Sequence, residues 1–168
     1  ELDVFGEDGS DILQRLLGRA DVLIANLTPA KRHKLGLSHE CIRAAYPRLV
    51  AVFESAFGES GKQAGQPGNE LVVQAMSGML AGEAKRLPDG APDIIRSCEI
   101  TQIPAGVMLA MAVSSALFHR ERSGSGQLVL SNDVGAALMF QGARIGRNSP
   151  DVETRKRTMA RVTGQRED

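Results

Sequence analysis

Two apolar runs constrain the fold of this chain more than any other feature of its sequence. Residues 21–27 (DVLIANL) and 49–57 (LVAVFESAF) are almost continuously apolar, which is typical of strands buried on both faces of a parallel sheet. Residues 11–20 before the first run and 38–46 between the runs space their apolar side chains at a helical period. This order predicts parallel crossovers, and hence an α/β fold with a partial Rossmann-like parallel sheet flanked by helices.

The second half of the chain extends this pattern. Residues 69–81 have a helical period, and the segment from about 104 to 121 is apolar enough for a buried helix. A third strand is expected at 127–131 (QLVLS), and a final helix at 133–145. The chain is therefore expected to end in a linker and a short C-terminal strand–helix unit.

The composition excludes several classes of function. The 168 residues contain 20 Lys and Arg against 20 Asp and Glu, so the chain lacks the basic field that nucleic-acid binding needs. The longest apolar stretch, Ile103–Phe118, has 16 residues, short of the roughly 20 that a membrane span requires. The two cysteines and three histidines lack the spacing of metal ligands, and isolated cysteines fit reduced thiols. We therefore expect a cytoplasmic protein with no metal and no nucleic-acid or membrane partner.

A cluster of basic residues follows the first predicted strand. Asn26 lies at the expected carboxyl end of that strand, where open parallel sheets bind ligands. Lys31, Arg32 and Lys34 follow, and cations that open a helix are unfavourable unless an anion is bound there. The residues alone leave two interpretations open, a solvated surface cluster or a phosphate-binding site.

A glycine-rich loop follows the second predicted strand. Gly58, Gly61 and Gly68 allow the backbone to approach a ligand closely or to adopt positive φ angles. Asn69 and Glu70 come next, at the start of a predicted helix. The loop is either a connector or part of a ligand site, and Glu70 either stabilises the helix dipole or acts as a functional acid.

Four ordered motifs give the chain a family resemblance. "ADVLIANLTP…LGLS", "YPRLVAVFESAFGESG", "PGNELVVQAMSGML" and "ALFHRERSGSGQLV" together resemble the class III CoA-transferases. That family includes formyl-CoA transferase, carnitine CoA-transferase and α-methylacyl-CoA racemase. The resemblance covers residues 1 to about 145 and implies a partial chain, because the family's chains are much longer. It assigns residues 1–122 to part of the large domain and 123–145 to a linker and the start of a second domain, and it leaves 146–168 as a charged tail.

The resemblance implies a role in acyl-CoA metabolism, with CoA transferred between carboxylic acids. A coenzyme A thioester would then be the substrate or ligand, a carboxylic acid the second substrate, and no cofactor would be bound covalently. The family forms interlocked dimers, so a homo- or hetero-oligomer is expected. The positions implied as CoA contacts are Asn26, Leu27, Lys34, Leu35, Gly58 and Gly61.

The position of the family's nucleophile departs from the family pattern. Family transferases attack the acyl-CoA thioester with an Asp carboxylate that precedes a glycine by four residues, and counting back from Gly106 gives Gln102. A glutamine cannot form the acyl anhydride, which leaves Glu70 as the remaining catalytic acid. Asn69 stands where the racemase has a catalytic His, so a racemase ranks last. Two hypotheses stay open, a degenerate transferase and a non-catalytic CoA-binding or dimerisation partner of a complete homologue, and with them the question of whether the chain is an active enzyme.

Overall fold

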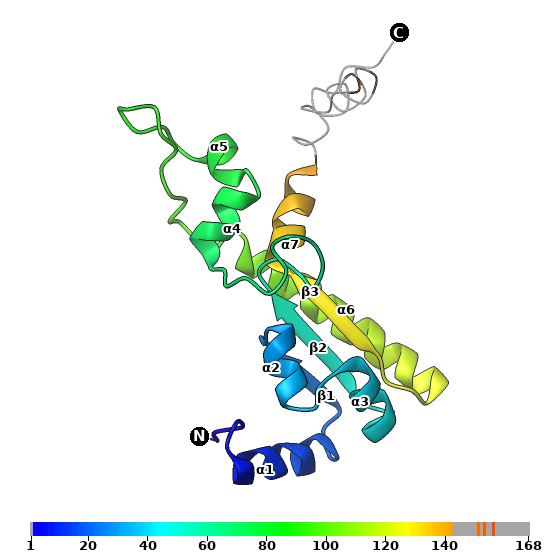
Figure 1. Cartoon of the computed structure of the whole chain (residues 1–168). Coiled ribbons are helices and arrows are strands. Elements are labelled where there is room, and N and C mark those ends of the chain that lie inside the picture. Colours follow the sequence, from blue (N-terminus) through cyan, green and yellow to red (C-terminus); the bar gives the residue numbers. More distant parts are fainter. Residues whose placement is uncertain (1, 143–150, 152, 154–155, 157–168) are drawn as a thin grey trace.

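A three-stranded parallel sheet organises the part of the chain that the structure, a computed structural model, describes: residues 2–142, 151, 153 and 156. Strands β1 (Val22–Ala25), β2 (Val50–Ser55) and β3 (Leu128–Asn132) lie side by side in that order (Figure 1). Each strand begins after a helical segment and all point the same way, so their carboxyl ends meet at one edge of the sheet. The parallel α/β architecture predicted from the sequence is confirmed.

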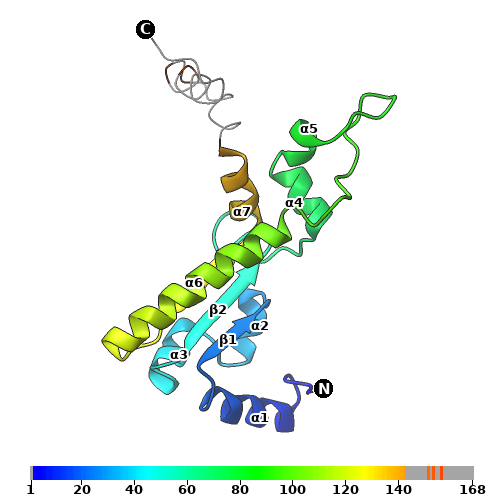
Figure 2. The ribbon, with the colours of Figure 1, turned by 180° about the vertical axis from the view of Figure 1, so that it is seen from behind.

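Helices cover the two faces of this sheet. On one face lie α1 (Glu7–Leu17), α2 (Pro29–Lys34) and α3 (His39–Ala45), and on the other lies α6 (Gln102–Ser123), as the two opposite views show (Figures 1 and 2). Ser38 caps α3 by accepting a hydrogen bond from the Cys41 N–H at 3.2 Å. The sheet is thus a central layer between two helical layers.

Strand β2 supplies the core on both faces. Ala51 and Phe53 pack with the helices of the first layer, whereas Val50 and Val52 pack against α6. All four are at most 2% exposed. Because successive side chains of a strand alternate between faces, this one strand joins both helical layers. Burial of each large apolar side chain contributes about 1.5–3 kcal/mol to the stability of the fold.

Strand β1 differs from the expected fully buried strand. It has four residues rather than the seven of the apolar run, and Ile24 is 59% exposed. Ile24 pairs with Val52 and therefore lies on the α6 face, but α6 packs chiefly over β2 and β3. An apolar run thus predicted the strand correctly and its burial incorrectly.

Helix α6 is longer and more exposed than the buried helix expected near 104–121. Leu109 and Ala116 pack against the sheet, but the opposite face, which carries Val107, Met111 and Phe118, is more than half exposed. The expectation of a buried helix is therefore wrong for that face. The 22 residues of α6 are long and apolar enough to cross a membrane, which the 16-residue stretch did not predict. Because one face packs on the sheet, we treat α6 as a helix of the domain.

The helix predicted at 69–81 is two helices. These are α4 (Glu70–Met76) and α5 (Met79–Glu83), and they are separated at Gly78. Gly78 has a φ of +76°, a left-handed conformation that ends one helix before the next begins.

The last strand and helix lie beyond the boundary expected at residue 122. Strand β3, within the segment expected as linker and second domain, pairs with β2 in the same sheet. Helix α7 (Asp133–Phe140) ends before residue 145. Residues 143–145 lie outside the described residues, as does most of the tail at 146–168.

Two glycines provide a matched test of this packing. A Cβ at Gly126 would lie 2.1 Å from the Leu49 carbonyl oxygen, a backbone atom, whereas a Cβ at Gly106 on α6 meets nothing within 4 Å. We expect Gly126→Ala to lower the free energy of unfolding by at least about 3 kcal/mol. Gly106→Ala should raise it by roughly 0.5–1 kcal/mol, because glycine destabilises a helix interior. Denaturant unfolding measures both, and equal effects would contradict the described packing.

Candidate active site

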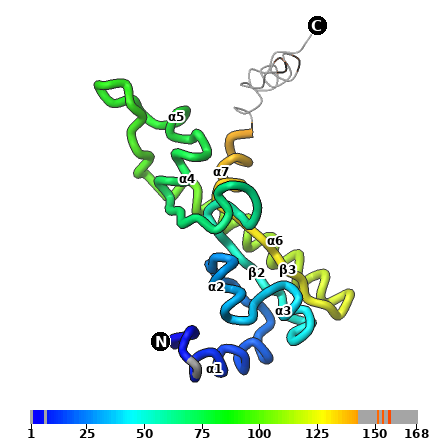
Figure 3. The backbone as a smooth tube through the Cα atoms, viewed as in Figure 1, coloured from blue at the N-terminus to red at the C-terminus, as the bar shows by residue number. Residues whose placement is uncertain are grey.

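The carboxyl edge of the sheet gathers the polar residues of interest. The segment after β2 passes beside α7 on its way to α4 (Figure 3), and the Val134 N–H donates a hydrogen bond to the Ala56 carbonyl at 3.1 Å. Asn26 follows β1 and Asp133 follows β3 at the same edge. Open parallel sheets bind ligands at this edge, so we treat it as the candidate active site.

The Glu70 carboxylate is the most highly coordinated group of the site. Its oxygens accept hydrogen bonds from the Thr101 hydroxyl (2.6 Å), the Gln74 amide (2.7 Å) and the backbone N–H groups of Thr101 and Gln102 (both 3.1 Å). These N–H groups open α6 and have no partner within the helix, so Glu70 caps α6 from 31 residues away. The two residues predicted as catalytic, Glu70 and Gln102, are therefore brought together.

Hydrogen bonding keeps Glu70 ionised. Burial alone would raise the pKa of this carboxyl, but the hydrogen bonds from Thr101, Gln74 and Gln102 outweigh it and lower the pKa. Asn69 is the N-cap of α4 and accepts a hydrogen bond from the Val72 N–H at 3.0 Å. Glu70 therefore acts as an ionised acceptor that fixes the start of α6, and Asn69 has a structural role.

Two carboxylates that the sequence analysis did not select lie at the same edge. Asp133 opens α7, and Glu54 lies on β2, where its partner on β3 is Ser131. Partial burial, the charge and hydrogen bond of Glu54 and the charge of Glu70 raise the pKa of Asp133 to about 6. The signal that could have revealed Asp133 is its place directly after a predicted strand, the same signal that selected Asn26.

The residues predicted to contact CoA are only partly accessible. Asn26 is exposed, Leu27 is half-buried against the core, and Leu35 is 4% exposed within the core. Lys34 is exposed and lines a shallow groove of about 520 Å³ together with Lys31. Lys34 and Asn26 can therefore reach a ligand, whereas Leu35, which borders the same groove as Lys34, packs mainly in the core.

Two glycines of the loop after β2 adopt the left-handed backbone conformation that glycine favours. Gly58 and Gly61 have φ angles of +78° and +91°. The Gly58 N–H donates a hydrogen bond to the Ser55 hydroxyl at 3.0 Å, and a Cβ at Gly58 would lie 3.5 Å from the Asn132 amide nitrogen. The loop is thus fitted against the ends of β2 and β3, next to Asp133.

Helix α2 corrects the interpretation of the basic cluster. It has six residues, and Lys31, Arg32 and Lys34 all fall in its last turn, where the helix dipole favours cations. Thr28 caps its start. Arg32 is buried and forms an ion pair with Glu59, so a solvated cluster is wrong for this residue.

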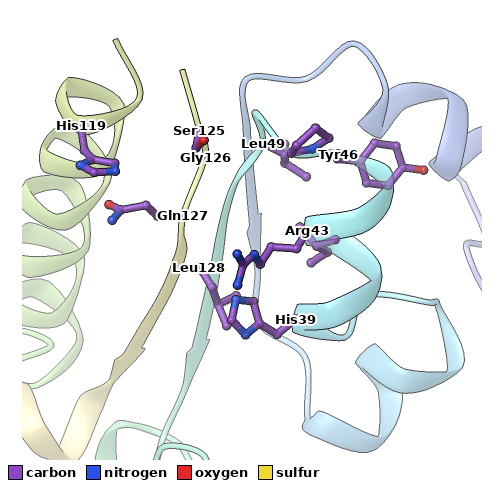
Figure 4. Close-up of a pocket in the computed structure, with 11 residues that line it drawn as sticks. His39, Arg43, Tyr46, Leu49, His119, Ser125, Gly126, Gln127 and Leu128 are labelled. Atoms are coloured by element: carbon purple, nitrogen blue, oxygen red, sulfur yellow. The ribbon is translucent and has the colours of Figure 1, made fainter. Parts of the chain in front are cut away.

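A larger groove lies at the opposite, amino edge of the sheet. Its volume is about 550 Å³, and Figure 4 shows Arg43 and His39 on its α3 side and His119 and Gln127 toward α6. None of the predicted site residues lines it. The candidate active site and this groove are therefore separate.

Comparison with known proteins places the chain in a family. The sequence model of CoA-transferase family III matches residues 1–167, so the chain belongs to this family. The chain is 34% identical to the acetyl-CoA:oxalate CoA-transferase of Acetobacter aceti over 125 residues, which cover 74% of this chain and 32% of the relative. It is 29% identical to the beta subunit of the succinyl-CoA–L-malate CoA-transferase of Chloroflexus aurantiacus, covering 73% of this chain and 30% of the relative.

A solved structure shows the same fold. The crystal structure of Rv3272 from Mycobacterium tuberculosis, a probable fatty acyl-CoA transferase, matches with a TM-score of 0.79 and 33% identity, covering 86% of this chain and 40% of that chain. The chain therefore spans about a third of the length of its curated relatives.

Removal of the Glu70 carboxylate tests the capping role. Glu70→Ala leaves the buried hydroxyl and N–H of Thr101 without an acceptor, so we expect the free energy of unfolding to fall by about 3 kcal/mol. Glu70→Gln keeps one acceptor oxygen and should lose roughly half as much. Urea unfolding measures both, with Glu99→Ala at an exposed neighbouring glutamate as the control. Equal small effects of all three substitutions would contradict the capping role.

The pKa of Asp133 predicts a pH dependence of stability. Because the pKa is raised from 3.8 to about 6 in the folded state, that state binds the proton more tightly, and the stabilisation is lost as pH rises from about 4 through 6. Asp133→Asn should therefore match the wild type in thermal stability at pH 4 and exceed it above pH 6. Thermal unfolding from pH 4 to 8 measures this, and parallel curves for the two proteins would refute it.

Proposed function

We propose that this chain is a CoA-binding part of a class III CoA-transferase that moves CoA between an acyl-CoA and a carboxylic acid. The observation that carries the proposal is the contact of Glu70 with the first turn of α6. Through this contact residue 102, the position that family resemblance assigns to the nucleophile, lies next to Glu70 at the start of α6. Family membership supports acyl-CoA chemistry.

Dicarboxylic acids are the substrate class that we propose for the acceptor. Oxalate and L-malate occur in the names of two relatives. Asn26 at the carboxyl edge and Lys34 at the end of α2 are exposed, and they supply an amide and a cation for the amides and phosphates of CoA. We also propose a cytoplasmic location, which the exposed free thiols of Cys41 and Cys98 support.

The residue at the nucleophile position favours a second candidate function. Gln102 is exposed at the start of α6 and has no carboxylate to attack a thioester. Glu70 is held by four donor groups, which leaves it poorly placed to replace a nucleophile. The chain would then be the non-catalytic partner of a complete homologue in a dimer, and the naming of one relative as a beta subunit supports an assembly of unlike chains.

Calorimetric titration with CoA and acetyl-CoA tests the binding proposal. We expect saturable binding with a Kd between about 1 and 100 μM, or roughly −8 to −5.5 kcal/mol. Lys34→Gln should weaken it about fivefold or more, because a charged phosphate contact is lost. Arg43→Gln, at an exposed arginine on the far edge, should leave it unchanged. Absence of heat and of any thermal shift would reject an independent CoA site.

A single substitution separates the two candidate functions. Gln102→Asp restores a carboxylate next to Glu70, so transfer of CoA from acetyl-CoA to oxalate should become measurable if only the nucleophile is missing. Gln127→Asp, the same change at the opposite edge, is the control. CoA binding without transfer in the Gln102→Asp variant would favour the non-catalytic partner, and co-purification with a longer homologue would then be expected.

A further inference from the structure

Arg32 differs from the basic residues around it. Lys31, His33 and Lys34 are exposed, whereas the side chain of Arg32 is 8% exposed. Its guanidinium forms an ion pair with Glu59 and lies over the ring of Phe53, 4.3 Å from the ring centroid. Its Nε is buried and has no hydrogen-bond acceptor among the described residues.

This arrangement leaves part of a buried cation unsatisfied. A buried N–H group without an acceptor destabilises a fold, because its desolvation is not compensated by a hydrogen bond. Arginine presents its donors as a planar fork that can hold a carboxylate or phosphate with two parallel hydrogen bonds. With Glu59 at Nη2 and no acceptor for Nε in the part of the chain that the structure describes, the Arg32 fork can hold a further oxyanion.

The partner of Arg32 lies on a segment that can move aside. Glu59 lies between Gly58 and Gly61, whose positive φ angles glycine adopts at no steric cost. A Cβ at Gly61 would meet nothing within 4 Å, so the loop is not packed against other atoms on that side of Gly61. The Glu59 side chain is 30% exposed and can exchange the arginine for water.

We propose that Arg32 is the receptor for an anionic oxygen group of the substrate, a phosphate or a carboxylate, and that Glu59 occupies it until the substrate arrives. The site lies at the carboxyl edge, on the same helix as Lys34 and on the sheet face opposite α6. The inference deepens the proposed function and rests on it for the source of the anion, either the phosphates of CoA or the second carboxylate of a dicarboxylic acid.

Substitution of Glu59 tests the proposal on the full chain. Glu59→Gln removes the competing carboxylate, and loss of a partly exposed ion pair worth roughly 1 kcal/mol corresponds to about a fivefold gain in anion affinity. Calorimetry with inorganic pyrophosphate, CoA, succinate and butyrate measures the gain. Arg32→Gln added to the Glu59→Gln variant should abolish this gain in affinity. Arg43→Gln added to the same variant should leave the gain unchanged.

The four probes separate the outcomes. A gain for pyrophosphate and CoA identifies a phosphate, whereas a gain for succinate that exceeds the gain for butyrate identifies the second carboxylate of a dicarboxylic acid. Pyrophosphate bound more tightly by Glu59→Gln, with CoA bound by no variant, would keep the Arg32 receptor and reject the proposed function. Unchanged affinities for every probe in Glu59→Gln would overturn the proposal and leave the ion pair a structural one. The Glu59→Gln variant therefore tests the proposal even if Arg32→Gln fails to fold.

Discussion

The burial of β2 on both faces is the constraint on which the remaining structure depends. Its four central residues, Val50–Phe53, are almost inaccessible and join the α1–α3 layer to α6. Because they alternate between faces, the residues that emerge at the carboxyl end of β2 are also divided between the faces. The glycine loop leaves from this end, and α7 returns beside it through the hydrogen bond from Val134 to Ala56. The buried apolar residues of β2 thus determine where the polar groups of the carboxyl edge lie.

The carboxyl edge holds two sets of charged groups with different electrostatics. On the α6 face, Glu70 is stabilised as an anion by donors, and its charge and that of Glu54 favour the protonated form of Asp133. On the other face, Arg32 is a buried cation held by Glu59. An acyl-CoA presents both a thioester that needs oriented polar groups and anionic groups that need cations. The division of charge at this edge is the physical basis of the proposal that the chain binds an acyl-CoA.

The sequence predicted the parts of the fold that depend on local pattern. The apolar run of β2 and the helical period of residues 38–46, which form α3, follow from residues adjacent in the chain. The contacts of the site do not, since Glu70 meets Thr101 across 31 residues and Arg32 meets Glu59 across a strand. A run of basic residues gives no sign of which one is buried, so Arg32 could not be distinguished from Lys31. The family resemblance selected Glu70 and Gln102 as site residues, which neither periodicity nor composition could do, and their contact became visible only in the structure.

Hydrogen exchange of the backbone amides with and without CoA tests the central claim most directly, because it reports where the ligand binds. If the carboxyl edge is the site, CoA should slow exchange in residues 26–34 and 56–61 and leave residues 39–49 and 124–128 at the amino edge unchanged. Protection confined to the amino-edge groove, or no protection in either region, would contradict the account.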